Sequence, residues 1–405
     1  MEETQVPLKS FDLFNPTDTH KMLRETIRDF VKAEIEPQAE ENDRKEFFNI
    51  QLFKKLGELG LLGITVNEEF GGAGMDVLSA VIAHEEISKS DPGFCLAYLA
   101  HALLCVNNLS INGSQAQKSK YLPKLCTGEW IGAMAMSEPA VGTDVVGMKT
   151  TAKKQDGKFI LNGRKMWITN GAVDDKGTPG DLIWVYARTG EDKRGRPAIS
   201  TFIVENGFKG FSVGQKIRGK TGMRASTTAE LVFDNCEVPL ENLVGNEGDS
   251  IGHMMRNLEI ERIGLAAMST GIALRSLEIM NRYAGVREAF GSPLNRFGQI
   301  QQHIAESYAK TTAARTYLYN TARLMDVSEG GNRIDSDGVK LFAAPVGKDV
   351  ADRAIQVLGG YGYVSEYVVE RLWRDAKLLE IGGGTLEAHQ KNITNDLSKN
   401  PEVLN

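Results

Sequence analysis

Several residues and patterns that mark specialised proteins are scarce in this chain. It contains four cysteines among 405 residues, and they are scattered, as Cys95, Cys105, Cys126 and Cys236, without a CxxC pair. No histidine lies at metal-ligand spacing from them, so we expect no metal site. Buried free thiols in a reducing compartment are favoured over disulfides.

Clusters of basic residues and long apolar stretches are absent as well. No cluster of five or more lysines and arginines occurs in a chain of net charge −6, so nothing electrostatic favours a nucleic-acid or anionic-membrane partner. No stretch of about 18 consecutive apolar residues predicts a membrane span.

Met1 to Thr4 are acidic and Glu402 to Asn405 form no targeting tag. We therefore expect a cytoplasmic protein, or a mitochondrial matrix protein if this is the mature form of an organellar one.

The overall composition is that of an ordinary soluble protein, with 41% hydrophobic and 25% charged residues. Helical periodicity runs from about Asp18 to Leu125, strand-like runs follow as far as Leu243, and helical periodicity returns from Gly248 to Leu397. The pattern predicts an α+β fold that is mainly α. We expect an N-terminal helical domain (1–129), a middle antiparallel β-barrel domain (130–245) and a C-terminal four-helix bundle domain (246–405).

Glycine and proline suggest where single elements end. Pro37 should close the first helix or lie just beyond it. Asp156-Gly157 and Asn162-Gly163 have the composition of two-residue hairpin turns, with β-rich runs on either side.

Two nucleotide-binding motifs need attention. The stretch from Gly214 to Thr221 fits GxxxxGK[ST] formally, but it is followed by polar residues and a strand-like run rather than by a helix. A P-loop works by opening a helix whose amides face the phosphates, so an NTPase is a remote alternative here. GxGxxG is absent, and a Rossmann dinucleotide site is therefore unsupported.

One carboxylate stands out in the last helical part. On a helix, Glu261 falls on a narrow face with Leu258, Leu265, Met268 and Ile272. An ionised carboxylate in such a stripe is costly unless it is paired or protonated. Two interpretations remain open from periodicity alone. One is a salt bridge to a neighbouring arginine, and the other is a general base whose pKa is raised by burial.

Four further stretches could line a ligand. The glycine loops 359–362 and 382–384 could each be a helix C-cap, but two such loops near residues 371–377 favour a cofactor or substrate lining. Residues 137–144 and 166–171 place hydroxyls beside glycine, tryptophan or an apolar run. These features suit a flat heteroaromatic ring, and the alternative is a core tryptophan with turn hydroxyls.

These stretches together resemble the acyl-CoA dehydrogenase family over nearly the full chain. The matching pieces are Met136-Ser137-Glu138-Pro139 with Gly142-Thr143-Asp144, Trp167-Ile168-Thr169-Asn170-Gly171, Arg287-Glu288-Ala289-Phe290-Gly291, Gln356-Val357-Leu358-Gly359-Gly360-Tyr361-Gly362 and Arg374-Asp375-Ala376-Lys377. Their order and spacing are far more specific than any single glycine motif.

The resemblance implies a homotetramer with FAD in each subunit. It implies that the flavin ring and pyrophosphate would lie against Met136, Ser137, Thr143, Trp167 and Thr169. The adenine-side half of an FAD bound mainly by a neighbouring subunit would meet Arg287, Phe290, Gln356 and Gly360, and FAD would also be touched by Thr385 and Glu387. Gly298 stands where a glutamine contact is common, so that contact is in doubt.

The family places its catalytic base in one of two positions. Most members carry a glutamate just before Gly-Thr in the late loop, where this chain has Gly383. Members of the isovaleryl type carry the base on the earlier helix in a Leu-x-x-Glu-Arg pattern, which Leu258 to Arg262 match with Glu261. The resemblance therefore implies that Glu261 takes the α proton of an acyl-CoA. The Gly383 N–H and a flavin ribityl hydroxyl would bind the thioester oxygen, and FAD N5 would accept the β hydride.

The resemblance also implies a substrate class and an electron acceptor. A short branched-chain acyl-CoA is favoured, and electron-transferring flavoprotein is the usual acceptor. The expected substrate-binding residues are Leu96, Ala97, Leu258, Glu259, Arg262, Gly382 and Gly384. Leu379 replaces a tyrosine of the isovaleryl type, and residues 388–392 are unlike that type. A cyclic, aromatic-bearing or other short acyl group, such as glutaryl, therefore remains open.

Overall fold

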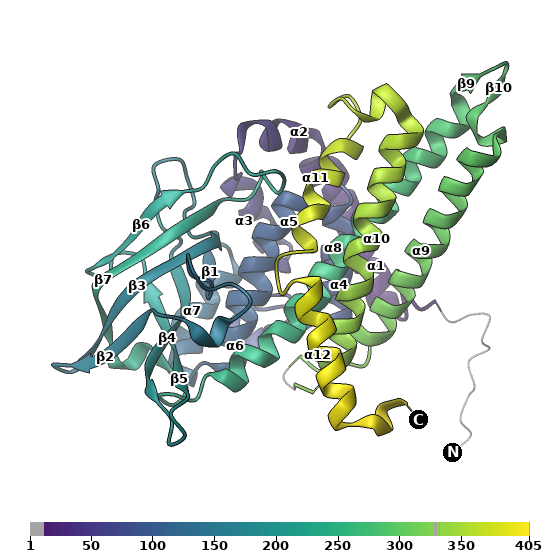
Figure 1. Ribbon diagram of the computed structural model, residues 1–405. Helices are drawn as coiled ribbons and strands as arrows, with labels where there is room; N and C mark the ends of the chain where they lie inside the picture. The colour runs from purple at the N-terminus through teal and green to yellow at the C-terminus, as the bar shows by residue number, and fades with distance from the viewer. Residues whose placement is uncertain (1–11, 328–329, 332, 405) are drawn as a thin grey trace.

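The chain folds into helices, then a sheet, then helices again. A computed structural model describes residues 12–327, 330–331 and 333–404 (Figure 1). The acidic start at residues 1–4, as well as Asn332 and Asn405, lies outside the described residues. The predicted order of α, β and α parts is confirmed, with the sheet on one side of the molecule and the last helices on the other.

The first part is helical up to Cys126. Its helices are α1 (Asp18–Phe30), α2 (Glu36–Lys45), α3 (Ile50–Glu58), α4 (Val77–Ser88), α5 (Pro92–Leu99), α6 (Asn108–Asn112) and α7 (Gln115–Cys126). Every residue of α4 and α5 is buried. Helix α5 is apolar throughout, whereas α4 also buries His84, Glu85 and Glu86. All four cysteines are buried and free, which confirms that expectation.

The expected helix end at Pro37 is wrong. Helix α1 continues through a wide π-turn at Val31–Ile35 directly into α2, and Pro37 lies in the first turn of α2. The Glu36 N–H donates to Val31 O, five residues back. Proline lacks an N–H and crowds the preceding turn, so it is tolerated where the ladder has already been widened.

The middle part is one sheet of eight strands. They are β1 (Gly132–Ala135), β2 (Thr151–Gln155), β3 (Lys158–Thr169), β4 (Leu182–Glu191), β5 (Pro197–Glu205), β6 (Phe211–Lys216), β7 (Thr228–Pro239) and β8 (Leu243–Val244). The order is β6-β7-β3-β2-β4-β5-β8, with β1 beside β4. Pairing is antiparallel except where β4 meets β1 and β2. Among the described residues no ladder joins β6 to β8, so the pairing does not close the predicted barrel.

Two stretches of the sheet domain bear on predictions made from the sequence. Asn162-Gly163 is no turn, because it lies inside β3 at a shift of register with β7. A Cβ at Gly163 would come within 2.5 Å of Thr150 Oγ1, so the glycine is there for close approach. The P-loop-like stretch begins within β6 and continues into the connection to β7, without the helix that phosphate binding requires.

The last part is built on three long helices. Helices α8 (Ile251–Val286), α9 (Gly298–Ala322) and α10 (Arg333–Leu358) pack side by side, and α11 (Val369–Leu379) and α12 (Leu386–Lys399) lie against α10. The short hairpin of β9 (Glu288–Ala289) and β10 (Ser292–Pro293) joins α8 to α9. Helix α8 thus runs from the sheet domain to the far end of the bundle.

Two helical stretches are long and apolar enough to cross a membrane by length and composition alone, Pro92–Asn112 and Ile251–Val286. Their apolar windows are 83% and 72% buried inside the protein, which is the behaviour of core helices. Helix α8 also packs closely on α4, since a Cβ at Gly271 would lie 2.4 Å from Glu85 O. Burial of α8 among α4, α9 and α10 accounts for its apolar composition.

A buried ion cluster ties the N-terminal helices to the bundle. Glu85 on α4 is paired with Arg24 of α1 at 2.7 Å and with Arg315 of α9 at 2.7 Å. Tyr319 Oη donates to the same carboxylate at 2.9 Å. Despite burial, these partners hold the pKa of Glu85 well below its usual range, at about 2. The cluster stabilises the junction as long as all of its members are present.

We predict that Glu85→Gln lowers the free energy of unfolding by about 3–5 kcal/mol, because it leaves Arg24 and Arg315 buried with incomplete charge compensation. Urea unfolding followed by circular dichroism measures this. The matched control is Glu41→Gln, which breaks the exposed pair with Lys45 and should stay close to wild type. Equal effects of the two substitutions would contradict the role of the cluster.

Candidate functional site

A cavity of about 510 Å³ lies where the loops after β1 face α8 and α12. It brings together eight of the residues singled out from the sequence, namely Met136, Ser137, Thr143, Leu258, Glu261, Arg262, Gly383 and Gly384. These residues come from three distant parts of the chain. The cavity is therefore assembled by the packing of the sheet domain on the bundle.

Glu261 is the most unusual residue of the cavity wall. It is 8% exposed, and no ion pair to it is formed among the described residues. Burial raises its pKa, and the positive charges of Lys340 and Arg262 oppose that rise. Arg262 pairs instead with Asp337 at 3.2 Å. Of the two interpretations open from the sequence, the salt bridge to an arginine is therefore wrong, and a carboxylate with a raised pKa remains.

The glycine loop lies directly against this carboxylate. Gly383 has a φ of +65°, and a Cβ added to it would lie 3.3 Å from Glu261 Oε1 and 2.3 Å from Leu265 Cδ1. The position thus requires glycine for both its conformation and its space. As a result the backbone of Gly383 is held beside a buried carboxylate in the cavity.

The two hydroxyl-bearing motifs of the sheet domain lie next to each other. Met166 N–H donates to Ser137 O at 2.9 Å, and the buried Lys165 ammonium donates to Met136 O at 2.9 Å. A shift of register between Lys165 and Ile168 accompanies a φ of +66° at Trp167, whose side chain is 63% exposed. Trp167 and Thr169 are not on the cavity wall, and they stand near it at the end of β3.

Neither Ser137 nor Thr143 makes a side-chain hydrogen bond to protein within the described ranges. Two free hydroxyls on a cavity wall, beside an exposed indole, match the donor set expected for a flat heteroaromatic ring. The alternative of a core tryptophan is wrong for Trp167, because that side chain is exposed.

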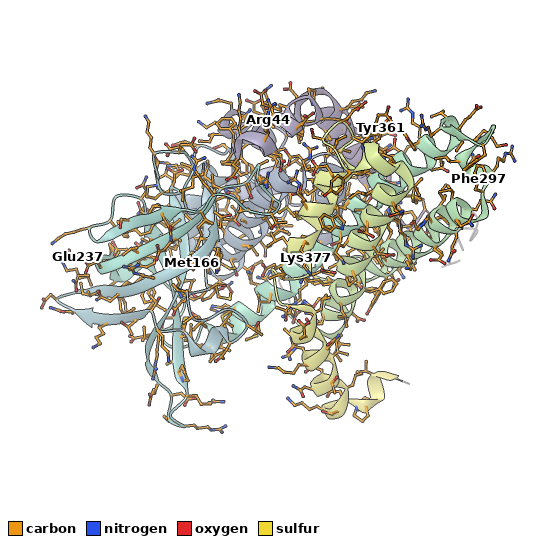
Figure 2. All side chains as sticks on the ribbon, turned by 45° about the horizontal axis from the view of Figure 1, so that its top comes forward. Arg44, Met166, Glu237, Phe297, Tyr361 and Lys377 are labelled. Atoms are coloured by element: carbon orange, nitrogen blue, oxygen red, sulfur yellow. The ribbon has the colours of Figure 1, made fainter. Side chains whose placement is uncertain are left out.

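The other predicted cofactor residues lie elsewhere. Arg287 and Phe290 are at the β9–β10 hairpin, with Phe290 97% exposed, and Gln356 and Gly360 are exposed where α10 ends. This is the far end of the bundle, where Figure 2 labels Phe297 and Tyr361, whereas Met166 marks the sheet domain. Within one chain these residues do not join the cavity. Thr385 caps α12 by accepting from Ala388 N–H at 3.3 Å, and Glu387 beside it is exposed.

Four predicted substrate residues also lie off the cavity wall. Leu96 and Ala97 are buried in the helical core, and Asn170 Nδ2 donates to Ala97 O at 2.9 Å. Glu259 faces the other side of α8, where it accepts from Gly331 N–H at 3.2 Å. Gly382 precedes the two glycines that do line the cavity. Leu96 and Ala97 are thus part of the hydrophobic core in this structure.

Sequence reasoning missed five residues of the cavity wall, which are Met134, Val145, Val146, Met255 and Arg333. Helical spacing gave a signal for Met255, which lies one turn before Leu258. Gly142 and Asp144 also line the cavity and belong to the stretch 137–144 singled out from the sequence. Three more wall residues come from the stretch 388–392, so its divergence falls on the cavity itself.

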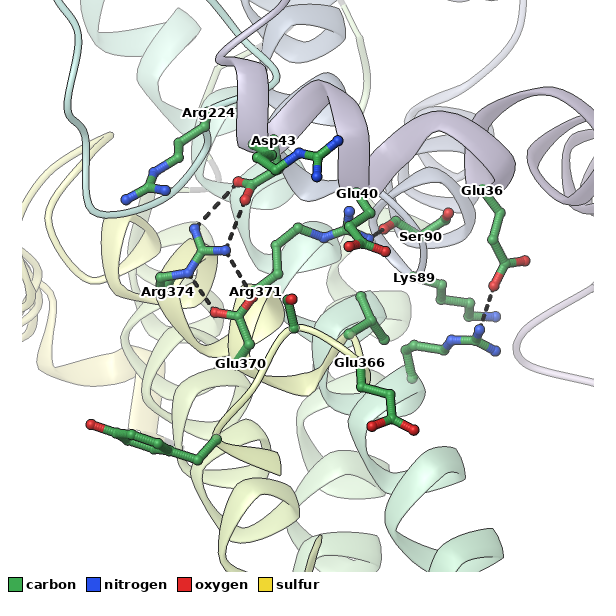
Figure 3. Close-up of a pocket in the computed structure, with 15 residues that line it drawn as sticks. Glu36, Glu40, Asp43, Lys89, Ser90, Arg224, Glu366, Glu370, Arg371 and Arg374 are labelled. Carbon is green, nitrogen blue, oxygen red and sulfur yellow. Dashed lines mark hydrogen bonds and ion pairs between the residues drawn. The ribbon is translucent and has the colours of Figure 1, made fainter. Parts of the chain in front are cut away.

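A second cavity, of about 490 Å³, lies between α2 and the start of α11 (Figure 3). It shares no residue with the first. Charged side chains of both signs line it and pair with one another, as Arg374 does with Asp43 at 2.8 Å and Glu370 at 2.7 Å. These pairs attach the N-terminal helices to the bundle. The cavity that contains Glu261 is therefore the candidate functional site.

We predict that the carboxyl of Glu261 stays protonated to a pH above the ordinary value of 4.5, because burial disfavours the charged form. A pH titration by infrared spectroscopy, taken as the difference between wild type and Glu261→Gln, would show a carboxylic C=O band that persists above pH 4.5. A band that disappears at or below that pH would contradict the raised pKa.

Comparisons with known proteins agree with this architecture. Three family models match in succession: the N-terminal domain of acyl-CoA dehydrogenase at residues 17–129, its middle domain at 133–236 and its C-terminal domain at 249–397. The chain is 45% identical to mitochondrial isovaleryl-CoA dehydrogenase of Solanum tuberosum over 94% of this chain and 91% of that one.

Superposition on solved structures indicates the same family. Butyryl-CoA dehydrogenase from Megasphaera elsdenii superposes with a TM-score of 0.89 at 36% identity, covering 94% of this chain and 98% of that one. An acyl-CoA dehydrogenase complexed with FAD, from Bacillus anthracis, superposes with a TM-score of 0.86 at 33% identity, covering 95% and 68%. The chain belongs to the acyl-CoA dehydrogenase family, and it is an oxidoreductase that acts on the CH–CH bond of its substrate.

Proposed function

We propose that this chain is an FAD-dependent acyl-CoA dehydrogenase that introduces an α,β double bond into a short branched-chain acyl-CoA, with Glu261 as the base. The observation that carries the proposal is the buried Glu261, which faces the cavity, forms no ion pair with any residue that the structure describes, and lies against Gly383. A dry carboxylate of raised pKa suits proton abstraction near neutral pH.

Each part of the reaction has a residue or group to carry it. The α C–H of a thioester is weakly acidic, and its proton would pass to the Glu261 carboxylate. The Gly383 N–H would donate to the thioester oxygen as negative charge develops there, because a preorganised amide stabilises an oxyanion. FAD bound in this cavity would supply the electron sink for the β hydrogen, which leaves as a hydride as the α,β double bond forms.

The donor set of the cavity fits FAD. The hydroxyls of Ser137 and Thr143 have no hydrogen-bond partner among the described residues, and with Met136 beside them they offer donors and an apolar wall for a flavin. The exposed Trp167 and the half-buried Thr169 would extend that surface. Thr385 and Glu387 at the start of α12 would add contacts close to the glycine loop.

A second subunit is part of this proposal. Arg287, Phe290, Gln356 and Gly360 lie at the far end of the bundle from the cavity of their own chain, so they would complete an FAD site in a neighbour. Large apolar side chains are exposed around them, with Val286 at 76% and Tyr363 at 85%. Exposed apolar groups of this kind mark interaction surfaces, and we propose the homotetramer that the family resemblance implies.

The proposed substrate and acceptor rest on similarity to relatives. Identity of 45% to an isovaleryl-CoA dehydrogenase supports a branched acyl chain. Divergence at residues 388–392 keeps a cyclic, aromatic-bearing or glutaryl chain as the alternative, since three of those residues line the cavity. We propose electron-transferring flavoprotein as the acceptor and no nucleic-acid or membrane partner.

We also propose domain limits of 1–129, 130–245 and 246–405, and either the cytoplasm or the mitochondrial matrix as the compartment.

We predict that Glu261→Gln binds acyl-CoA and FAD but reduces the flavin about 10²–10⁴-fold more slowly, because the amide cannot accept the α proton. Stopped-flow bleaching of the flavin by isovaleryl-CoA measures this. The control is Glu278→Gln on the same helix, where Glu278 pairs with Arg275 at the surface. If Glu261→Gln still bleaches at the wild-type rate, Glu261 is not the base.

We predict that isovaleryl-CoA reduces the flavin with a higher kcat/KM than isobutyryl-, butyryl-, glutaryl- or cyclohexanecarbonyl-CoA. Each methylene that fits or clashes in a pocket changes selectivity by about 10–200-fold. Steady-state rates of the purified yellow protein with an artificial electron acceptor, measured at several concentrations of each thioester in this panel, rank the substrates. A cyclic or glutaryl thioester at the top would replace the branched-chain assignment and leave the dehydrogenase chemistry in place.

A further inference from the structure

A group of fully buried polar side chains lies behind the glycine loop, on the side away from the cavity. Asp337 and Lys340 come from α10 and His389 from α12, and each is 0% exposed. Lys340 Nζ donates to Gly384 O at 2.6 Å and lies 3.2 Å from His389 Nε2. His389 Nδ1 is 2.5 Å from Asp337 Oδ1.

His389 Nε2 also lies 3.0 Å from Gly384 O. One arrangement of protons accounts for all of these contacts, with the Lys340 ammonium donating to both Gly384 O and His389 Nε2. Asp337 is an acceptor, so the proton of neutral His389 is on Nδ1 and its Nε2 accepts from the Lys340 ammonium. Burial and the charge of Lys340 both lower the pKa of His389, which agrees with a neutral ring. Asp337 is further compensated by Arg262 at 3.2 Å. The cluster therefore links α8, α10 and α12 through one carboxylate.

The loop is confined from both sides. Gly384 has a φ of +96°, and a Cβ there would lie 2.9 Å from His389 Cε1, so the imidazole packs on the backbone itself. On the other face, the Cβ direction of Gly383 points at Leu265 and the Glu261 carboxyl. The Gly384 carbonyl held by Lys340 is two peptide planes from the Gly383 N–H. Fixing one restricts the other.

We infer that Asp337, Lys340 and His389 are positioning residues of the active site, which hold the Gly383–Gly384 backbone against Glu261 and place one buried cation behind that carboxylate. This inference rests on the proposed function, since it concerns how the proposed base and the Gly383 N–H are kept in register. The three side chains touch neither the cavity nor the reacting atoms.

The charges around Glu261 define the electrostatic part of the inference. Lys340 from α10 and Arg262 from α8 act on it directly and lower its pKa against burial. Around these two cations lie Asp337, Glu259, Glu380 and Arg333, and neutral His389 closes the α12 side. Arg262 is engaged by Asp337, so Lys340 is the cation whose removal should change Glu261 most. Burial also brings the pKa of Lys340 itself down to about 8.

The experiment uses the FAD-loaded enzyme and isovaleryl-CoA. Flavin reduction requires ionised Glu261, so its rate rises with pH through the Glu261 pKa. Removing a nearby cation raises that pKa, and Lys340→Met should therefore move the rising limb to higher pH by about one unit or more. The infrared band of Glu261 should move in the same direction without any turnover. His389→Asn keeps the cation, so it should lower the limiting rate with little shift of the limb.

Two further variants make the result decisive. Lys348→Met removes a half-exposed lysine two turns along the same helix and should leave both readouts unchanged. Lys340→Gln keeps a donor for Gly384 O without the charge. If Lys340→Met does not fold, Lys340→Gln tests whether the charge of Lys340 lowers the pKa of Glu261.

The inference is overturned if folded, FAD-containing Lys340 variants titrate like wild type, or if Lys348→Met shifts the limb equally. If Glu261→Gln abolishes bleaching while the Lys340 variants behave as wild type, only this inference fails. If Glu261→Gln retains bleaching, the proposed function itself fails.

Discussion

The free-energy cost of keeping one carboxylate out of water governs the architecture of this site. Glu261 is buried on α8 in an apolar stripe with Leu265, Met268 and Ile272, and each unit by which its pKa rises corresponds to about 1.4 kcal/mol. That cost is tolerable because α8 is held by extensive packing against α4 and α10 and by the ion cluster around Glu85. A strongly buried helix can therefore hold a desolvated carboxylate in place near the end where the sheet domain meets it.

The arrangement of charges explains why Glu261 can remain reactive. A direct ion pair would stabilise the carboxylate and remove its basicity, and here the adjacent Arg262 is engaged by Asp337 instead. Lys340 supplies a compensating charge without contacting the carboxylate, because its ammonium is bonded to Gly384 O and His389. The carboxylate is thus partly compensated and still available. The same helix, α8, ends at the hairpin that carries Phe290, so one helix connects the proposed base to the surface proposed for a neighbouring subunit.

The sequence allowed the order of the parts and most elements to be predicted, since periodicity and glycine loops are local signals. It failed where a local rule was overridden by the surroundings. Pro37 continues a helix because a π-turn precedes it, and Asn162-Gly163 stays in β3 because Thr150 packs against the glycine. Glu261 could be found because a carboxylate interrupts an apolar stripe. Lys340 and Asp337 could not, since a charged pair three residues apart on a helix is usually solvated, and only the packing of α12 shows that they are buried.

The identity of residue 383 follows from the position of Glu261, the proposed base. A side chain there would begin 3.3 Å from the Glu261 carboxyl and 2.3 Å from Leu265, so a base on α8 and a side chain at 383 compete for one volume. With the proposed base on the helix, residue 383 must be glycine, and its backbone N–H would then approach the substrate without a Cβ in the way. The gain in access carries a loss of rigidity, since consecutive glycines are the least restrained backbone. The buried contacts of His389 and Lys340 with Gly384 restrict the loop from the side opposite Glu261. They replace the restriction that a side chain on the loop would otherwise provide.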